Sequence, residues 1–322
     1  MKILLTGGAG FIGSNLARHL VSLEKVDKVR VFDNLATGSL KNFEEFKENP
    51  KFEFVEGDIR NYVDCMAAAK GMDAISHQAA LGSVPRSIND PLTTNDVNIT
   101  GTLNIFTAAK ENGIKRIVYA ASSSTYGDHP GLPKVEDTIG KPLSPYAVTK
   151  YVNELYASVY ARTYGLELIG LRYFNVFGPK QDPSGAYAAV IPLFIKAVLN
   201  NEPPRINGDG AHSRDFTFID NVVQVNELAL FTKNEQAINQ VYNVAFGEQT
   251  SLSDLFRLIK EIAGSDLAPF YGPDRPGDVK HSLADISKAK TLLGYDPKVG
   301  TREGLKIAFE WYRKQHHFGY SS

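Results

Sequence analysis

Short apolar runs alternate with longer amphipathic segments through the first half of the chain. The apolar runs are typical of buried parallel strands, which we expect at Lys2–Thr6, Lys28–Phe32, Phe52–Val55, Asp73–His77, Ile114–Ala121 and Leu166–Phe174. Between them a helical period predicts helices at Ile12–Leu23, Val63–Ala69, Thr93–Glu111 and Tyr146–Tyr164. Strands that alternate with helices predict an α/β fold, a doubly wound parallel sheet with helices on both faces.

The pattern loosens after Phe174. We expect loops at 178–185, at the Pro203-Pro204 pair and at 272–277. Two strand-like runs, Phe216–Ile219 and Val241–Ala245, suggest that the chain returns to the first sheet before it ends. The expected organisation is therefore one domain from 1–173, joined by 216–247, and a smaller interleaved C-terminal domain within 174–322.

The composition is that of an ordinary globular protein. Hydrophobic residues make up 43% and charged residues 22% of the 322 positions, which excludes a disordered or collagen-like chain. Basic and acidic residues nearly balance, with a net charge of −1. Because no positive surplus is present to hold a phosphate polymer or an anionic membrane, we expect neither a nucleic-acid nor a membrane partner. A small phosphorylated ligand needs only two or three arginines and stays compatible with this charge.

Cysteine and histidine usage points away from disulfides and metals. Cys65 is the only cysteine and lies among alanines, which is typical of a small apolar helix residue. His77, His316 and His317 lack metal-ligand spacing, so we expect no metal. No apolar run approaches the roughly 18 residues of a membrane span, and no signal peptide is evident at the N-terminus. A cytosolic location is expected.

A glycine-rich segment follows the first predicted strand and opens the first predicted helix. Gly7, Gly10 and Gly13 allow a tight turn, a close backbone approach to a pyrophosphate, and close packing of helix on strand. The helix N-terminus would supply free N–H groups and a positive dipole end to phosphates. A Walker-type loop is excluded, because Ser14 stands where that motif requires lysine.

Two acidic strand ends strengthen the prediction of a dinucleotide site. Asp33 ends the second strand, twenty residues beyond Gly13. A carboxylate there accepts hydrogen bonds from the adenosine ribose and repels a 2′-phosphate, which favours NAD over NADP. Asp58 and Ile59 follow the third strand and are expected to flank the adenine. Residues 1–173 therefore read as a Rossmann-like NAD-binding domain.

A tyrosine and a lysine share one face of the helix that Ser144 and Pro145 begin. Tyr146 and Lys150 are four residues apart, so an ammonium would lie near a phenol and lower its pKa. Ser122 ends the fifth strand, and strand ends of this kind face the ligand crevice. The serine could therefore hydrogen-bond the same substrate oxygen that Tyr146 deprotonates.

These residues resemble the extended short-chain dehydrogenase/reductase family over nearly the whole chain. More narrowly, the stretch from Ala121 to Tyr156 looks like the bacterial UDP-N-acetylglucosamine 4-epimerases of surface-polysaccharide synthesis. The resemblance implies a fixed NAD that removes hydride from C4 while Tyr146 takes the O4 proton. The 4-keto sugar then turns over and receives the hydride on its other face, so UDP-N-acetylgalactosamine forms without net oxidation. It also implies a homodimer, paired through the predicted helices Thr93–Glu111 and Tyr146–Tyr164.

The resemblance assigns further positions to the site. The resemblance adds six cofactor positions to those above: Phe11, Ile12, Asn34, Gln78, Asn98 and Tyr173. It also places Tyr146 and Lys150 in contact with the cofactor. The UDP-sugar positions are Ser122, Ser123, Asn175, Ala189, Asn207, Arg214, Arg275, Asp278 and Ser282. Arg214 and Arg275 lie next to loops, and arginine forks are suited to hold a diphosphate. In the family, a small residue at the position of Ser282 leaves room for an N-acetyl group, whereas tyrosine there accompanies glucose and galactose.

Several alternatives stay open at this stage. The physiological sugar could be the N-acetylhexosamine, its uronic acid, or glucose as well, and the pathway is not indicated. A sugar-nucleotide 4,6-dehydratase is disfavoured, because Ser123 and Ser124 stand where that family places Asp-Glu, and the related decarboxylases carry a Glu that is also absent. A net dehydrogenase would accumulate NADH. A non-enzymatic dinucleotide-sensing regulator would need the glycines but not Tyr146 and Lys150.

Overall fold

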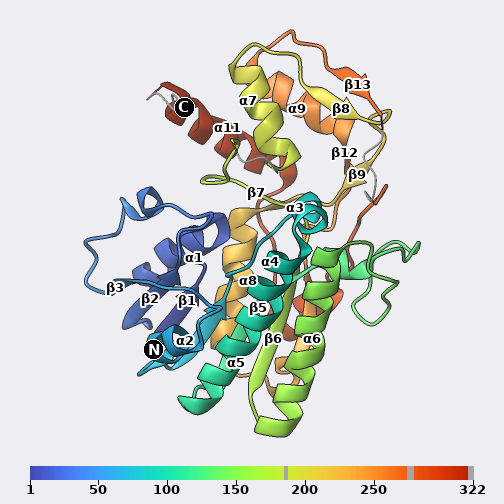
Figure 1. Ribbon diagram of the computed structural model, residues 1–322. Coiled ribbons are helices and arrows are strands. Elements are labelled where there is room, and N and C mark those ends of the chain that lie inside the picture. The colour runs from blue at the N-terminus through green and yellow to red at the C-terminus, as the bar shows by residue number, and fades with distance from the viewer. Residues whose placement is uncertain (185–187, 274–278, 318–322) are drawn as a thin grey trace.

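The computed structural model describes residues 1–184, 188–273 and 279–317 of the chain. Its main feature is a sheet of seven strands, all parallel, in the order β11-β6-β5-β4-β1-β2-β3 (Figure 1). The strands are β1 (Lys2–Thr6), β2 (Lys28–Asp33), β3 (Phe52–Glu56), β4 (Ala74–His77), β5 (Arg116–Ser122), β6 (Glu167–Tyr173) and β11 (Gln240–Val244). The order reverses between β1 and β4, which is where ligands bind in folds of this class.

Helices cover both faces of this sheet, as the alternating side chains of β1 require. Ile3 and Leu5 pack in one cluster with α1 (Phe11–Ser22) and α8 (Ile219–Phe231). Leu4 points to the other face, where the cluster contains residues of α2 (Tyr62–Ala69), α5 (Gly101–Glu111) and α6 (Pro145–Tyr164). Burial on both sides explains why these strands are continuous apolar runs rather than alternating ones.

A smaller unit lies beyond the carboxyl ends of the strands (Figure 1). It contains α7 (Val190–Leu199), α9 (Leu252–Ala263) and α11 (Thr301–His317), with three two-stranded pairs, β10–β7, β12–β9 and β13–β8. Their bounds are β7 (Val176–Phe177), β8 (Arg205–Asn207), β9 (Ser213–Arg214), β10 (Thr217–Phe218), β12 (Thr250–Ser251) and β13 (Phe270–Gly272). The remaining helices are α3 (Val84–Asn89), α4 (Pro91–Asn95), α10 (Ser287–Leu293) and the short turns Leu40–Phe43, Asp96–Thr100, Ser123–Tyr126 and Glu235–Ala237.

Residues 93–111 are helical throughout, as predicted, with a π-helical turn at Asp96–Thr100 between α4 and α5. One expectation about elements is wrong. The run Phe216–Ile219 does not join the first sheet: β10 pairs with β7, and Ile219 already begins α8. The run at Val241–Ala245 does return, since β11 pairs with β6 along its whole length. The division into domains at residue 173 stays a prediction. Within the described ranges, no helix combines the length and the apolar character needed to cross a bilayer.

Candidate active site

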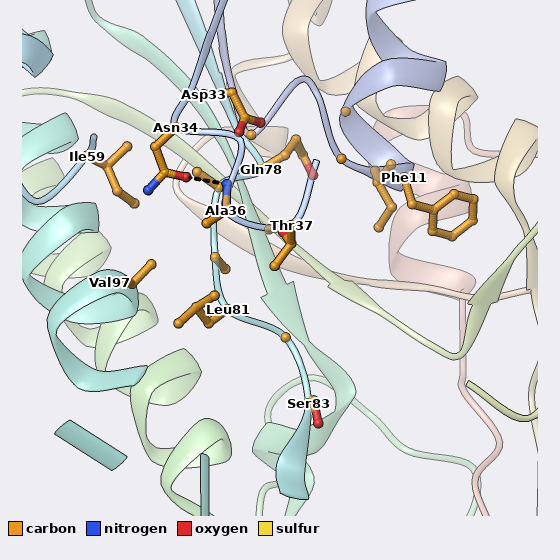
Figure 2. Close-up of a pocket in the computed structure, with 18 of the residues that line it drawn as sticks. Phe11, Asp33, Asn34, Ala36, Thr37, Ile59, Gln78, Leu81, Ser83 and Val97 are labelled. Atoms are coloured by element: carbon orange, nitrogen blue, oxygen red, sulfur yellow. Dashed lines mark hydrogen bonds between the residues drawn. The ribbon is translucent and has the colours of Figure 1, made fainter. Parts of the chain in front are cut away.

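A cavity of about 580 Å³ opens at the carboxyl ends of β1, β2, β4 and β5. Thirteen of the fourteen predicted cofactor residues line it: Gly7, Gly10, Phe11, Ile12, Gly13, Asp33, Asn34, Asp58, Ile59, Gln78, Tyr146, Lys150 and Tyr173. In Figure 2, Ile59, Val97 and Leu81 gather on one side, while Asp33 and Asn34 lie at the end of β2. The cavity therefore collects residues from many separate strand ends, as the parallel sheet requires.

The glycine loop brings the start of α1 to this cavity. Gly7 has φ +69°, and a Cβ on it would meet the Ala79 backbone nitrogen at 2.5 Å. A Cβ on Gly13 would meet the Gly7 oxygen at 2.2 Å, so loop and helix approach too closely for a side chain. On Gly10 a Cβ would touch only the Gly7 oxygen, at 3.4 Å, and would otherwise fill open space. Gly10 caps α1 with no side-chain hydrogen bond, so the helix N-terminus is left open for a pyrophosphate.

Asp33 is bound to the backbone on two sides. Its Oδ2 accepts from the Ala9 N–H at 2.9 Å and its Oδ1 from the Leu35 N–H at 2.8 Å. Burial raises the pKa of Asp33, while these N–H groups lower it. Figure 2 shows the Asn34 side chain turned towards the Ala36 N–H, which donates a hydrogen bond to Asn34 Oδ1 at 3.1 Å. The carboxylate is thus held at the base of the cavity, where a ribose would need it.

Asp58 is an ionised carboxylate at the end of β3. Arg60 donates to both of its oxygens, and Asn34 donates from Nδ2 at 2.8 Å. The Arg60 hydrogen bonds are the main reason that the pKa of Asp58 falls to about 2. Asp58 therefore stays charged at every working pH and keeps Arg60 at the rim of the cavity.

The three predicted catalytic residues come together at one end of this cavity. Ser144 caps α6 by accepting from the Ala147 N–H at 3.1 Å, which fixes the first turn that carries Tyr146. Lys150 is 4% exposed, and its Nζ lies 6.0 Å from the Tyr146 ring centroid while donating to the Ala120 oxygen at 2.9 Å. Ser122 lies at the end of β5, where its Oγ accepts from the Ser124 Oγ at 2.8 Å.

The pKa of Tyr146 does not follow the direction expected from its lysine neighbour. Burial raises it, and a hydrogen bond with Ser122 lowers it. Burial likewise lowers the pKa of Lys150 to about 8, against the attraction of Glu154. The ammonium beside the phenol was expected to lower the pKa of Tyr146. Burial removes water from both groups, however, and this loss disfavours each charged form.

His77 lies in the protein interior beneath the catalytic helix. Its Nδ1 bonds the Thr6 hydroxyl at 2.7 Å and its Nε2 bonds the Thr102 hydroxyl at 3.0 Å. Burial lowers the pKa of His77 to about 3, with a smaller contribution from Lys150. The ring is therefore neutral and structural. Among the described residues no group of three or more His, Cys, Asp or Glu side chains is placed to bind a metal.

Asn98 and Ser123 do not line either of the cavities, although both were expected to touch a ligand. The amide of Asn98 is used inside the protein. It accepts from the Leu81 N–H at 2.8 Å and donates to the Leu81 oxygen at 3.1 Å and to the Thr149 hydroxyl at 3.1 Å. Asn98 thus holds the loop that forms one cavity wall, and its expected contact with the cofactor stays a prediction.

A second cavity, of about 630 Å³, lies in the smaller unit, lined by residues of β7, α7, β8 and β9. Val176 and Gln181 line both cavities, so the two meet there. Four predicted substrate residues line the second one: Asn175, Ala189, Asn207 and Arg214. Ser282 does not line it, but it lies beside Asn175, whose Nδ2 is 3.5 Å from the serine Oγ. Arg275 and Asp278 lie outside the described residues.

The structure adds lining residues that the sequence did not reveal. In the first cavity they include Thr37, Arg60, Thr93, Val97, Gln181 and the run 79–83. The run 79–83 directly follows β4, so its position at a strand end was a usable signal. The others come from loops and helices whose approach depends on tertiary packing. In the second cavity Phe177, Leu252 and Phe270 bring apolar surface that no motif marks.

Comparison with known proteins agrees with this geometry. The model of the NAD dependent epimerase/dehydratase family matches residues 3–245. A putative UDP-glucose 4-epimerase of Methanocaldococcus jannaschii is 40% identical over 96% of this chain and 97% of its own length. A solved UDP-N-acetylglucosamine 4-epimerase of Methanobrevibacter ruminantium, in complex with UDP-N-acetylmuramic acid, is 39% identical, covers 98% of each chain and has a TM-score of 0.92. The UDP-glucose 4-epimerase of Thermotoga maritima, solved with UDP-glucose, is 38% identical over 98% of this chain and 100% of its own, with the same TM-score.

Proposed function

The chain belongs to the NAD dependent epimerase/dehydratase family and is an NAD-dependent UDP-sugar 4-epimerase, and we propose that its substrates are UDP-N-acetylglucosamine and UDP-N-acetylgalactosamine. The observation that carries the proposal is the junction of the two cavities. Tyr146, Lys150 and Ser122 line the first, Arg214 and Asn175 line the second, and Val176 and Gln181 belong to both. A sugar that joins a diphosphate at Arg214 to the catalytic tyrosine would lie across this junction.

The protein's own residues supply binding and proton transfer. The start of α1 at Gly10 and the Asp33 carboxylate suit the pyrophosphate and ribose of NAD, which supplies a hydride acceptor and donor at C4 when bound. Tyr146 removes the proton from O4 and later returns it. Ser122 donates to the same oxygen and keeps it oriented towards the phenol. Lys150 then favours the phenolate, because its ammonium is held on the same helix face.

The choice of N-acetylated sugars rests on Ser282. It is small, its N–H donates to the Ser213 oxygen at 3.1 Å, and Asn175 lies beside its hydroxyl. A short side chain at this place leaves volume for the acetamido group at C2. The solved relative from Methanobrevibacter ruminantium acts on UDP-N-acetylglucosamine, and the one from Thermotoga maritima is named for UDP-glucose, so the family offers both specificities. A role in surface-polysaccharide synthesis, which the sequence resemblance implies, is part of the proposal.

The test is turnover of purified protein on three sugar nucleotides, UDP-N-acetylglucosamine, UDP-glucose and UDP-N-acetylglucosaminuronate. We expect the N-acetylhexosamine to have the highest kcat/KM and denatured protein to release NAD rather than NADP. Preference for the uronate or for glucose would replace the proposed substrate. Turnover that accumulates NADH would indicate a dehydrogenase, and no turnover with any of the three would favour a regulator.

We also propose that the protein is a homodimer paired through α6 and the neighbouring α3 and α4. Val148, Leu155 and Val159 recur at helical spacing on α6 and are 46%, 50% and 43% exposed. Ile88 on α3 is 56% exposed and Leu92 on α4 is 82% exposed. A second copy that presents the same stripe would bury these side chains in one helical bundle. The cytosolic location expected from the sequence stays a prediction.

A further inference from the structure

Asp215 lies between Arg214 and the strand β10, and it is fully buried. Its carboxylate is satisfied by backbone N–H groups from two distant segments. Oδ1 accepts from the N–H groups of Phe246 at 3.1 Å and Gly247 at 3.2 Å, and Oδ2 accepts from Gly247 and from Ala284, each at 3.2 Å. Among the described residues no basic side chain forms an ion pair with it. The charge is therefore held by the backbone alone.

The two segments that meet at this carboxylate come from different parts of the fold. Phe246 and Gly247 lie two and three residues beyond the end of β11, an edge strand of the large sheet. Ala284 lies two residues beyond Ser282, whose N–H donates to the Ser213 oxygen. The main-chain oxygen of Asp215 also accepts from Asn175 Nδ2 at 3.2 Å. One residue thus touches the strand that carries Arg214, the segment that carries Ser282, and Asn175.

We propose that Asp215 is a positioning residue for the sugar-nucleotide half of the cleft, because its carboxylate holds the Ser282 segment and the Arg214 strand against the end of the large sheet. The proposal rests on the substrate placement proposed above, with the diphosphate at Arg214 and the C2 substituent near Ser282. Asp215 itself lines neither cavity, so it acts through these neighbours and not on the substrate.

The buried charge of Asp215 lowers the stability of the fold at neutral pH. Burial raises the pKa of Asp215 from 3.8 to about 6, although the backbone N–H groups lower it. A carboxyl whose pKa is higher in the folded than in the unfolded chain makes the protein lose stability as the pH rises from 3.8 to about 6, and the loss is complete above about 6. The fold therefore carries an ionised group that reduces its stability at neutral pH, and groups of this kind concentrate at functional sites.

The first test is the variant Asp215→Asn, which keeps the size of the side chain. Its amide can still accept from Phe246 and Gly247, but its NH₂ then faces the Ala284 N–H, donor against donor. We expect bound NAD to be retained, kcat to stay within about threefold, and the Kd of UDP and the KM of the UDP-sugar to rise about 10- to 100-fold. The preference for N-acetylated sugar over UDP-glucose should shrink as well. Backbone amides at 279–286 should exchange faster, and those at 205–207 should not.

The matched control is Asp220→Asn, five residues further on at the start of α8 and outside both cavities. It should leave the Kd of UDP and the sugar preference unchanged. A purely structural role for Asp215 would instead lower the unfolding midpoint and kcat with Kd, KM and preference unchanged, and that result would overturn the proposal. Loss of NAD together with UDP binding would also overturn it.

Two further variants test the contact at Ala284 and the placement of the diphosphate. If Asp215→Asn gives no folded protein, Ala284→Pro removes the N–H that Asp215 binds, places the ring Cδ against the carboxylate and fixes φ at this residue, so it should raise the Kd of UDP in the same way; an unchanged Kd contradicts the proposal. Arg214→Met separates the two proposals. If it leaves UDP affinity unchanged, the placement of the substrate is wrong. If it weakens UDP binding while Asp215→Asn does not, only the role of Asp215 is wrong.

Discussion

Single side chains in this cleft owe their chemistry to how much water surrounds them. Tyr146 and Lys150 share a helix face, yet burial raises the pKa of the phenol and lowers the pKa of the amine. The tyrosine therefore starts as a neutral phenol and needs Ser122, Lys150 and the bound cofactor to become a base.

Tyr146→Phe removes the proton acceptor while the ring still packs. We expect kcat to fall about 10²–10⁴-fold, with little change in KM, because UDP binding depends on residues of the second cavity. Tyr151→Phe, on the same helix and outside both cavities, is the control and should keep kcat. Steady-state kinetics on the preferred UDP-sugar decides; a Tyr146→Phe enzyme with more than about a tenth of the original kcat would exclude Tyr146 as the base.

Ser282→Tyr tests the proposed space for the acetamido group. Overpacking a formed pocket costs about 1–3 kcal/mol, so activity on N-acetylated sugars should drop from about fivefold to over a hundredfold. UDP-glucose and UDP-galactose should be turned over at least as well as before, because they lack the bulky group. Ser282→Ala should retain the original preference. The measurement is kcat/KM on both sugar classes, and an unchanged ratio in Ser282→Tyr would show that this position does not select the sugar.

His77 makes stability depend on pH. Its pKa is near 3 in the folded chain against 6.5 for an ordinary histidine, so the unfolded chain binds more protons between these values. The stability is therefore complete above pH 6.5 and is lost as the pH falls, by about 1.4 kcal/mol per pH unit from this group. In urea unfolding at pH 7, 6 and 5, His77→Gln should show a shallower loss than the original protein. His316→Gln, exposed on α11, should match the original slope; equal slopes in all three proteins would mean that the pKa of His77 is not lowered in the folded chain.

Elements place these residues, and they differ in how far local sequence determines them. The strand ends, the glycine turn and the start of α6 follow from short patterns. From these patterns the glycines, Asp33, Asp58, Ile59, Ser122, Tyr146 and Lys150 of the first cavity could be predicted. The internal hydrogen bonds of the Asn98 amide could not be predicted, because a motif does not show which way a side chain points. The π-helical turn within 93–111 could not be predicted either, because apolar spacing continues through it. The pairing of β10 with β7 depends on packing far along the chain, which two residues of sequence cannot encode.

One buried ion pair fastens the catalytic helix to the sheet. Arg172 on β6 donates to both oxygens of Glu154 on α6, at 2.9 and 2.7 Å, and both side chains are less than 9% exposed. Glu154→Gln leaves the Arg172 charge buried without its partner, which should lower the free energy of unfolding by about 3–5 kcal/mol. The control is Glu167→Gln, which breaks the more exposed pair with Arg116 and should cost about 0–1 kcal/mol. Denaturant titration compares them, and equal losses would mean that burial adds nothing to the first pair.

At the scale of the whole molecule, the two cavities make the smaller unit and the sheet one functional body. The first cavity, proposed for NAD, lies at the sheet, the second, proposed for the diphosphate, lies in the smaller unit, and the reacting sugar would lie where Val176 and Gln181 join them. Activity therefore depends on the relative position of the two parts as much as on either part alone.

The proposed dimer depends on an exposed apolar stripe on α6, which charged substitutions can disrupt. Leu155→Lys combined with Val159→Lys places two charges in the proposed dimer stripe and should convert a dimer into a monomer at micromolar concentration. Ile307→Lys, which changes an apolar residue that is 41% exposed on α11, should leave the dimer intact. Sedimentation velocity distinguishes the species. A monomeric original protein, or a double variant that stays dimeric, would exclude this surface as the interface.

β11 is an edge strand of the large sheet, but it is synthesised long after its neighbour β6. The large sheet lacks its edge strand until residue 244 has left the ribosome, and 66 residues of other structure separate β6 from β11. Until then β6 presents unpaired backbone groups, an edge that other chains can join. The nascent sheet thus has an open edge from the synthesis of β6 until β11 pairs with it.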